Sequence, residues 1–544
     1  MRRTTSLALT ILVLVGLSFG IAAGVNASKI PNEQYWLPSL LLSEGLPAAQ
    51  PAIRPIVFVH GGAGSAQQFE TQAMRFTSND YPPEYIRVFE YDSSFTVESF
   101  DAVLERLDAF IDKVLEGTKA DKVDLVGHSL GTVVSLQYLA YAPHRLKVAH
   151  YVNIDGSGGQ RAPRGIPTLA LWSNLSTARV MLGATRNIWI PSQTHTELCT
   201  SAETFAEMYK FLTGREPKTL DIVPEDDITV EGRVVIFPHN IYNDEVEAIL
   251  EIWEVNNSTG QRSGSQPVAT FNITGPDGRW GPFKAKPGTY YEFAIVREGR
   301  PVHHIYREPF MRSNYWVTLL TSAPGGVSDY VNVSENHVML LFMRNKEFWG
   351  DQGIKNDELW INGTNVINQN NCPVAKLVCG IWVYDKDSDG KSNINTPIEV
   401  FHRLLFQTGV DLYIPASPGG AGVINITLVS RGGESIRTIN VPNWPSDSPD
   451  GGHRITVHFN DYTPSTSSSK ARVYTAQCVD QPSEQSQPAA VSLFCKASAA
   501  GNGLLATDSI RVKLACQFPN FSIPALILKH VFRENEEELF YLKV

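Results

Sequence analysis

The stretch Val123-Asp-Leu-Val-Gly-His-Ser-Leu-Gly131 places a serine between two glycines, at a point where the sequence pattern changes. The apolar run at 123–126 is typical of a buried strand, and residues 130–141 follow with the pattern of a helix. A tight strand-to-helix turn crowds its backbone, so small residues are needed two positions on either side of the serine. The turn also puts Ser129 at a helix N-terminus, where backbone N–H groups stabilise negative charge. We therefore predict that Ser129 is a nucleophile.

The region around this turn alternates short apolar strands with amphipathic helices. Alternation of this kind is typical of a parallel sheet that crossover helices cover on both faces, so we predict an α/β domain over residues 28–218. The predicted strands are 56–59, 85–91, 123–126, 148–154, 168–172 and 187–190, and the predicted helices are 99–116, 130–141 and 202–212.

After residue 216 the helical stretches disappear. Strands with alternating apolar and polar residues and recurrent turns, such as Gly275-Pro-Asp-Gly278, indicate β-sheet structure. We predict a β-sandwich at 225–312 and a second β-rich domain at 313–474, packed as a sandwich or barrel. Residues 475–544 begin with a Ser/Gln/Pro-rich segment and show no clear period, so their structure stays unknown.

The composition bounds the class of protein. At about 100–200 residues per domain, 544 residues predict several domains. Hydrophobic residues at 43% supply ample core material, which excludes disorder as the dominant state. A formal net charge of −10 argues against nucleic acid as the main partner, because phosphate binding needs a basic surface.

A second glycine-rich segment follows the first predicted strand. His60-Gly-Gly-Ala-Gly64 lies where the other half of an oxyanion hole is expected for a G-x-S-x-G turn. We predict that the backbone N–H groups of Gly62 and Leu130 are the donors of this oxyanion hole. His60 and His128 are predicted to shape the site and not to act as bases.

A nucleophilic serine needs a base and an acid that orients it. His195 follows the strand 187–190 in a polar loop before the last helix, which makes it the predicted base. The loop after strand 168–172 contains no carboxylate, but Asp155 ends the strand before it and preserves the chain order Ser–Asp–His. We predict Asp155 as the acid. Glu197 is the alternative, although it lies only two residues from His195.

With these motifs in place, residues 54–215 resemble an α/β-hydrolase of the lipase/esterase kind. The whole arrangement resembles archaeal thermophilic lipases, in which a small catalytic domain with a minimal lid precedes a β-rich lipid-binding domain. The segment 230–310 resembles a prealbumin-like or carboxypeptidase-regulatory sandwich. The resemblance implies a catalytic domain at 28–218 that cleaves carboxylic esters and acylglycerols without a cofactor.

The predicted reaction is acyl transfer to water through an acyl-enzyme on Ser129. Its expected partners are an ester or acylglycerol substrate and a lipid interface; the sequence leaves the oligomeric state open. An acyltransferase or thioesterase of the same fold, or a non-catalytic secreted lipid-binding protein, are the alternatives. The short loop after Asp155 excludes a large cap domain, so a lid is expected from residues 93–100 or 70–84.

One acidic loop in the second β-rich region has the spacing of a calcium site. Asp385, Asp387 and Asp389, followed by Gly390, match the D-x-D-x-D-G spacing that gathers oxygens around Ca²⁺. The last ligand position departs from that pattern, because Thr396 replaces its glutamate. A structural calcium ion at these three aspartates is therefore one prediction, and an Asx-rich turn without metal is the other.

The N-terminus predicts export. Arg2 and Arg3 precede an uncharged run, and small residues before Ser28 fit a signal peptide at 1–27; an uncleaved membrane anchor is the alternative. An oxidising compartment favours disulfides among the six cysteines, and Cys372–Cys379 is the one pair we predict. A secreted glycoprotein also fits eight N-x-S/T sequons at Asn174, Asn256, Asn257, Asn272, Asn332, Asn362, Asn425 and Asn520.

Overall fold

The computed structural model describes residues 53–156, 160–173, 179–242, 244, 246–449 and 451–462, together with the backbone of five strands beyond them. The predicted signal peptide, Asn174, Asn520, Cys478, Cys495, Cys516 and most of the 475–544 tail lie outside the residues whose side chains are described. Among the described residues, no helix is long and apolar enough to cross a membrane.

The first part of the described chain is a six-stranded, all-parallel sheet with the strand order β2-β1-β3-β4-β5-β6. The predicted α/β fold is therefore confirmed, and the predicted strands match the observed ones to within a few residues. The strands are β1 (Ile56–Val59), β2 (Ile86–Phe89), β3 (Val123–His128), β4 (Val148–Ile154), β5 (Thr168–Ser173) and β6 (Arg186–Ile190).

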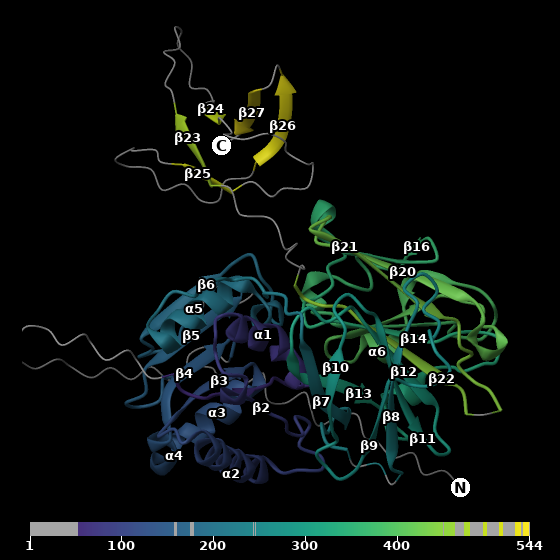
Figure 1. Ribbon diagram of the computed structural model, residues 1–544, viewed down its shortest axis with the longest axis horizontal. Coiled ribbons are helices and arrows are strands. Elements are labelled where there is room, and N and C mark those ends of the chain that lie inside the picture. The colour runs from purple at the N-terminus through teal and green to yellow at the C-terminus, as the bar shows by residue number, and fades with distance from the viewer. Residues whose placement is uncertain are drawn as a thin grey trace, which may run out of the picture. The chain divides into compact units, whose positions relative to one another are not determined.

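Helices cover both faces of this sheet (Figure 1). Side chains of β1 alternate between the two faces: Phe58 packs with residues of α1 and α5, and Val57 with residues of α2 and α3. Each face buries an apolar cluster, which is why most residues of the central strands are apolar. The helices are α1 (Glu70–Ser78), α2 (Phe100–Thr118), α3 (Leu130–Ala140), α4 (Ala142–Leu146) and α5 (Ala202–Thr213).

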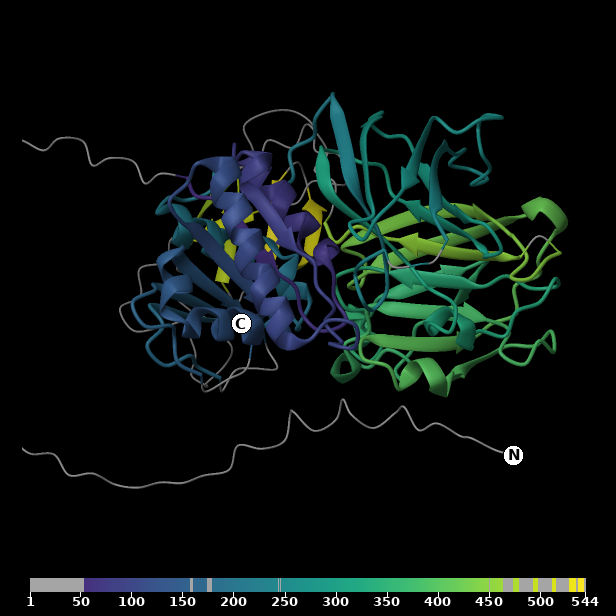
Figure 2. The ribbon, with the colours of Figure 1, turned by 90° about the horizontal axis from the view of Figure 1, so that it is seen from below.

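The β-rich half forms three sheets, of which Figure 2 shows the long strands in green. A nine-stranded sheet has the order β18-β19-β17-β14-β22-β12-β11-β8-β9, and sheets of three strands (β10-β7-β13) and four strands (β16-β15-β20-β21) accompany it. The strands are β7 (Ile228–Ile236), β8 (Ala248–Glu254), β9 (Ala269–Ile273), β10 (Arg279–Ala285), β11 (Tyr291–Arg297), β12 (Val302–Arg307), β13 (Asn314–Thr321), β14 (Leu340–Met343), β15 (Glu358–Ile361), β16 (Thr364–Asn365), β17 (Gly380–Tyr384), β18 (Asn393–Pro397), β19 (Gln407–Asp411), β20 (Val423–Ser430), β21 (Ser435–Pro442) and β22 (His453–His458), with one short helix, α6 (Glu399–His402).

Strand pairing crosses the predicted boundary at 312–313. β12 pairs in parallel with β22, from Val302 against His453 to Arg307 against His458, and β13 pairs in parallel with β7. One apolar cluster lies between the four-stranded sheet and β14, β17 and β22; another joins the three-stranded sheet to β8 and β11. The two predicted β domains therefore share one sheet and bury two cores against it.

Beyond residue 472 the described backbone is a five-stranded arrangement, which the sequence left without a prediction. Its strands are β23 (Val473–Cys478), β24 (Leu493–Ala497), β25 (Arg511–Leu514), β26 (Leu528–Glu534) and β27 (Glu537–Leu542), in the order β25-β23-β24-β27-β26.

The 70–84 stretch is not a lid, so that prediction is wrong. Every residue of α1 from Glu70 to Thr77 is buried. The Glu70 carboxylate pairs with Arg307 of β12 at 2.6 Å and accepts a hydrogen bond from the Asn314 side chain at 3.0 Å. Helix α1 therefore fills the junction between the sheet and the β-rich half.

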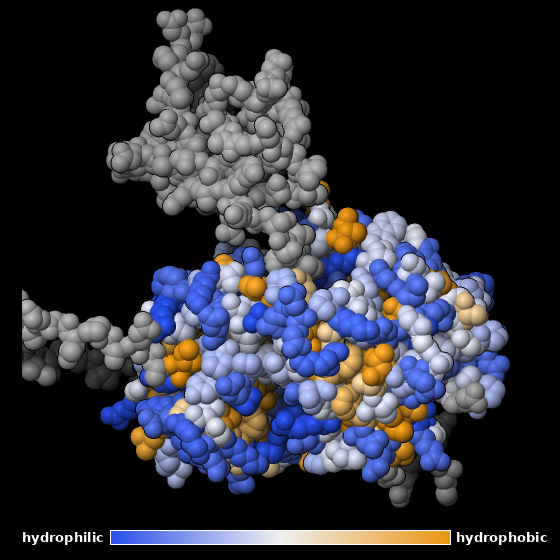
Figure 3. Space-filling view, viewed as in Figure 1, coloured by the Kyte–Doolittle hydropathy of each residue, from blue (hydrophilic) through white to orange (hydrophobic). Residues whose placement is uncertain are grey.

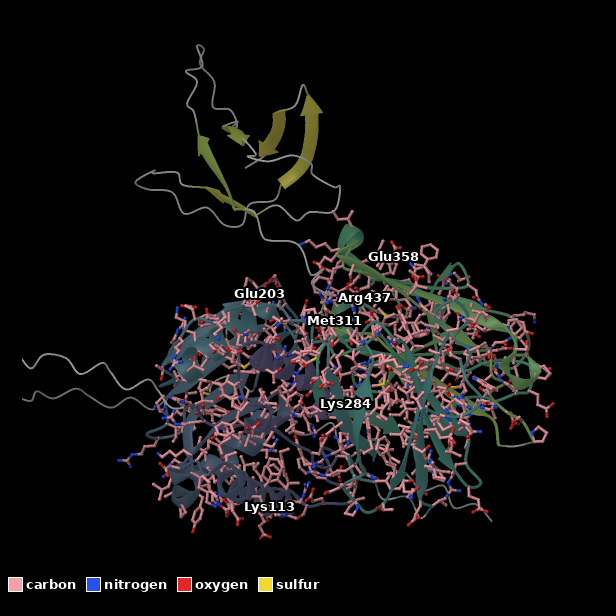
Figure 4. The ribbon with its side chains drawn as sticks, viewed as in Figure 1. Lys113, Glu203, Lys284, Met311, Glu358 and Arg437 are labelled. Atoms are coloured by element: carbon pink, nitrogen blue, oxygen red, sulfur yellow. The ribbon has the colours of Figure 1, made fainter. Side chains whose placement is uncertain are left out.

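A small apolar cluster closes another part of that junction. Met74 of α1 packs with Ile222, Met311 and Tyr462, and Arg437 donates a hydrogen bond to the carbonyl of Tyr462 at 2.5 Å. Figure 4 labels Met311, from the apolar cluster, and Arg437, from the hydrogen bond. The apolar contact and the hydrogen bond both connect segments that are far apart in the chain.

The predicted Cys372–Cys379 disulfide is wrong, because both cysteines are free thiols. Cys372 is buried in the apolar cluster of the second β-rich region, whereas the Cys379 Sγ lies 3.2 Å from the hydroxyl of Thr196. Cys372 and Cys379 are only seven residues apart in the sequence, but their side chains lie in different environments. Cys199 is also a free, buried thiol.

Candidate active site

Ser129 lies at the turn between β3, which ends at His128, and α3, which begins at Leu130. Its backbone has φ +50° and ψ −119°, a region that is costly for a residue other than glycine. A Cβ on Gly131 would lie 2.2 Å from the carbonyl oxygen of Val59, and one on Gly127 would lie 2.8 Å from that of Gly131. The two glycines are thus required because the turn packs directly against neighbouring backbone.

His195 and Asp155 lie together at the carboxyl edge of the sheet, where Ser129 also lies. Asp155 directly follows β4, and His195 lies in the loop between β6 and α5. The His195 Nδ1 is 2.6 Å from the Asp155 Oδ2, and the two side chains are 13% and 2% exposed. Because Nδ1 is taken by the carboxylate, Nε2 is the ring nitrogen that remains for proton transfer.

Ser173, at the end of β5, holds the carboxylate of Asp155 in place. Its backbone N–H donates to Oδ1 at 3.0 Å, and its hydroxyl donates to Oδ2 at 2.9 Å. We predicted no role for Ser173, because only a carboxylate was sought after this strand. A serine at the end of the strand that pairs with β4 is the signal that pointed to this role.

Glu197, the alternative acid, is directed elsewhere. Its carboxylate pairs with Lys346 at 3.2 Å and with Arg431 at 3.3 Å, both in the β-rich half. Burial by itself raises the pKa of Glu197, but these two cations outweigh it and leave the pKa below its ordinary value. The geometry at the His195 Nδ1 therefore favours Asp155.

The segment after β1 presents a free backbone donor beside Ser129. The N–H groups of Gly61, Ala63 and Gly64 donate to the Gln68 side chain, the Ser93 hydroxyl and the Gly61 carbonyl at 3.0, 3.0 and 3.1 Å. Within the described part of the chain, this leaves the N–H of Gly62 without a partner.

Leu130 supplies the second predicted donor. As the first residue of α3, its N–H belongs to the first helical turn, which has no intrahelical acceptor. A Cβ on Gly62 would lie 3.5 Å from the Leu130 side chain, so the two segments are adjacent. The two predicted oxyanion donors are therefore close to each other.

The histidines next to these loops have structural roles. His60 is fully buried, stacks on Tyr91 at 4.3 Å and lies 3.3 Å from Glu90. His128 donates a hydrogen bond from Nε2 to the carbonyl of His195 at 3.1 Å. Burial lowers the pKa of His128 to about 3, so its ring stays neutral near pH 7 and supports the His195 loop without adding charge.

A cavity of about 340 Å³ opens beside the Gly62 segment. Gly62, Ala63, Gly64 and Thr196 are among its lining residues, and most of the wall comes from the β-rich half. Figure 3 shows apolar residues on the viewed surface as separate patches among hydrophilic ones. The cavity wall contains both apolar and charged side chains, and its charged residues are Arg297, Arg300, Asp329, Arg344 and Arg454. Its large apolar lining residues are Phe237, Leu320, Val327, Met339, Leu341, Met343, Trp382, Leu405 and Phe406.

The acidic loop at 385–390 is arranged as a turn. Asp385 is buried, and its carboxylate accepts the backbone N–H groups of Asp389 and Gly390 at 3.3 and 2.8 Å. Asp389 pairs with Lys391 at 3.0 Å. Among the residues that the structure describes, no group of three or more His, Cys, Asp or Glu side chains is placed to hold a metal ion. Calcium binding at the three aspartates stays a prediction.

The fold and the loop geometry define an α/β-hydrolase with a serine at the nucleophile turn. Residues 53–141 match the family model described as lipase (class 2), residues 226–324 match that of the lipase C-terminal domain, and residues 326–463 match a further C-terminal domain. Three successive parts of the chain are thus similar to these families, and the class 2 lipase match lies within the six-stranded parallel sheet and its helices.

Solved lipase structures show more distant similarity. Lipase B of Aspergillus fumigatus is 15% identical with a TM-score of 0.25; the match covers 32% of this chain and 57% of that lipase. Lipase BlEst2 of Bacillus licheniformis, in its propeptide form, is 12% identical with a TM-score of 0.24, over 75% of this chain and 97% of that one. The similarity to lipases rests on the matching family models and not on these structures.

Proposed function

We propose that the protein hydrolyses carboxylic esters with long acyl groups, acylglycerols among them, with Ser129, His195 and Asp155 as its catalytic triad. The observation that carries the proposal is the 2.6 Å contact between His195 and Asp155, formed at the sheet edge where the strained Ser129 turn also lies. The class 2 lipase match over residues 53–141 supports the same reaction class.

In this mechanism His195 Nε2 takes the Ser129 proton as the hydroxyl attacks the ester carbonyl. The resulting oxyanion accepts hydrogen bonds from the N–H groups of Gly62 and Leu130. Collapse of the tetrahedral intermediate breaks the ester bond, and His195 protonates the leaving alcohol. Water then attacks the acyl-enzyme by the same route and releases the carboxylic acid. Asp155 orients the imidazole and stabilises its charged form.

The cavity supports an acyl chain as the group that is recognised. The segment of Gly62, beside which the reacting carbonyl lies in the proposed mechanism, lines this cavity, and so do nine large apolar side chains of the β-rich half. Charged side chains, Arg297, Arg300 and Arg344 among them, also line it. A cavity of about 340 Å³ matches the size range of sites that bind small molecules. The β-rich half would therefore bind the substrate, and a lipid interface would supply it.

The test combines active-site labelling with a chain-length series. A fluorophosphonate probe is expected to label the wild-type protein and Ser265→Ala, a control at an exposed serine in the β-rich half, but not Ser129→Ala. Initial rates on p-nitrophenyl esters of two to eighteen carbons, and on a triacylglycerol emulsion, are expected to favour chains beyond the shortest. Cleavage of only the shortest esters would contradict the lipid assignment, and no labelling of the wild type would contradict the enzyme itself.

A further inference from the structure

The loop that carries His195 is held by one carboxylate from the β-rich half. Glu347, four residues after β14, accepts three hydrogen bonds from this loop. The Thr194 hydroxyl donates to its Oε2 at 2.6 Å, the Thr196 N–H to its Oε1 at 2.6 Å, and the Glu197 N–H to its Oε2 at 3.0 Å. The donors bracket His195 on both sides along the chain.

These hydrogen bonds are expected to be strong because Glu347 is fully buried. A buried carboxylate is stable only when hydrogen bonds or a cation compensate its charge. Among the described residues Glu347 forms no ion pair, so the His195 loop supplies much of that compensation. Withdrawal of the loop would leave the charge buried and poorly solvated, which ties the position of the loop to Glu347.

The segment that presents Glu347 is itself immobilised. Arg344 donates to the backbone carbonyls of Lys346 and Glu347 at 2.6 and 2.5 Å and pairs with buried Asp357 at 2.6 Å. Arg431 pairs with the same aspartate and, at 3.3 Å, with Glu197. Glu347 therefore acts from a rigid platform in the β-rich half.

Two further groups of that half contact the His195 loop. The Phe406 ring lies parallel to the His195 ring, with centroids 6.1 Å apart and planes 6° apart. The Cys379 Sγ lies 3.2 Å from the Thr196 hydroxyl. His195 is therefore held in three ways. Asp155 contacts the imidazole Nδ1, the Phe406 ring lies parallel to the imidazole, and Glu347 accepts hydrogen bonds from the residues on both sides of His195.

We propose that Glu347 is a positioning residue for catalysis: by fixing residues 194–197 it holds His195 in line with Ser129 and Asp155. This inference rests on the proposed function, because it assigns a role relative to that triad. Glu347 touches no reacting atom and acts through the loop. The β-rich half then contributes to the chemical step itself and not only to substrate binding.

Two substitutions separate this role from a general packing role. Glu347→Gln keeps the shape but has one acceptor oxygen, so in either orientation its NH₂ group faces a backbone N–H of Thr196 or Glu197. Thr194→Val is nearly isosteric and removes only the hydroxyl donor, whereas Thr194→Ser retains it. Glu335→Gln, at an exposed position of the same half, is the matched control.

We expect kcat on a short soluble ester to fall by about 10- to 100-fold in Glu347→Gln and about fivefold in Thr194→Val, at nearly unchanged KM. The rate of fluorophosphonate labelling should fall by the same factors, since it also depends on His195 as the base. Thr194→Ser and Glu335→Gln should stay near wild type. The double variant Glu347→Gln/Thr194→Val should lose less than the product of the two single losses, because both remove the same contact.

A folded Glu347→Gln with wild-type kcat would overturn the inference, as would a change confined to KM. If Glu347→Gln does not fold, the two Thr194 variants test the proposal in its place. Equal activity of Thr194→Val and Thr194→Ser would overturn it. Failure of the proposed function is distinguishable, because the wild-type protein would then show neither ester cleavage nor labelling.

Discussion

Ser173 donates two hydrogen bonds to Asp155, one from its backbone N–H to Oδ1 at 3.0 Å and one from its hydroxyl to Oδ2 at 2.9 Å. The carboxylate comes from the end of β4 and the donors from the end of the neighbouring β5. Parallel pairing, which matches Ile154 with Leu171, brings the two strand ends together. The acid of the proposed triad is thus oriented by the strand next to its own.

Ser173→Ala should therefore weaken catalysis without abolishing it. The variant loses the hydroxyl donor to Oδ2 but keeps the backbone donor to Oδ1. Losing one hydrogen bond to a buried charge costs about 1–2 kcal/mol, which corresponds to roughly a five- to thirtyfold fall in kcat/KM. Steady-state kinetics on a soluble ester measure this, with Ser265→Ala as the control. Unchanged kinetics would show that the backbone donor is sufficient.

The identity of the acid can be tested by a pair of substitutions. Asp155→Asn should lower kcat by about 10⁴-fold, because the amide cannot hold His195 in the tautomer that accepts the serine proton. Glu197→Gln should retain far more activity, because Glu197 pairs with Arg431 and Lys346 and not with the His195 Nδ1. Single-turnover rates of both variants decide between them. A larger loss in Glu197→Gln would reverse the assignment.

Filling the cavity should shorten the preferred acyl chain. Leu341, on β14, is half-buried and lines the cavity, so Leu341→Trp would occupy space that a long chain needs. We expect kcat/KM for esters of twelve or more carbons to fall at least tenfold and that for two- to four-carbon esters to change little. Ile354→Trp is the control, because Ile354 is 89% exposed and is not a lining residue. Equal losses at all chain lengths would place the acyl group elsewhere.

One buried carboxylate should make stability depend on pH. Glu292 in β11 is fully buried; Arg262 donates to it at 2.9 and 2.7 Å, and His304 donates at 2.6 Å. Burial alone would raise the pKa of Glu292, but these hydrogen bonds outweigh it and lower the pKa to about 2 from an ordinary 4.5. The folded protein thus binds this proton less tightly than the unfolded chain. The resulting stabilisation, on the order of 3 kcal/mol, is present above pH 4.5 and is lost as the pH falls toward 2.

Glu292→Gln should consequently lower the thermal midpoint most at pH 6 to 7, with a difference from wild type that narrows toward pH 3. Thermal unfolding followed by circular dichroism at each pH gives this comparison. Glu247→Gln, at an exposed position of the same region, should follow the wild-type curve throughout. A constant difference across the pH range would mean that packing, and not the charge of Glu292, accounts for the loss.

Several features could be predicted because they leave a local pattern. The glycines on either side of Ser129 are needed by one tight turn, and the apolar strands of the sheet are buried on both faces. Asp155 was also predicted, because it directly ends a strand and precedes His195 in the chain. The prediction of a lid at 70–84 was wrong, because a segment that covers a site and a segment that fills a junction between domains have the same sequence pattern. The Cys372–Cys379 pair was wrong because proximity in sequence says nothing about which core a side chain enters.

The sequence by itself determined the α/β architecture, the turn that holds Ser129, the strand that Asp155 follows and the loop that contains His195. These features depend on local backbone sterics and apolar periodicity, which act within a few residues. Only the tertiary structure decided that Ser173 orients Asp155, that α1 is buried and that Glu347 holds the His195 loop. Glu347 and Thr194 are 153 residues apart in the chain, and their contact depends on how two separately patterned halves bury charge against each other. No local pattern records such a contact, since burial and compensation of a charge are properties of the assembled interface.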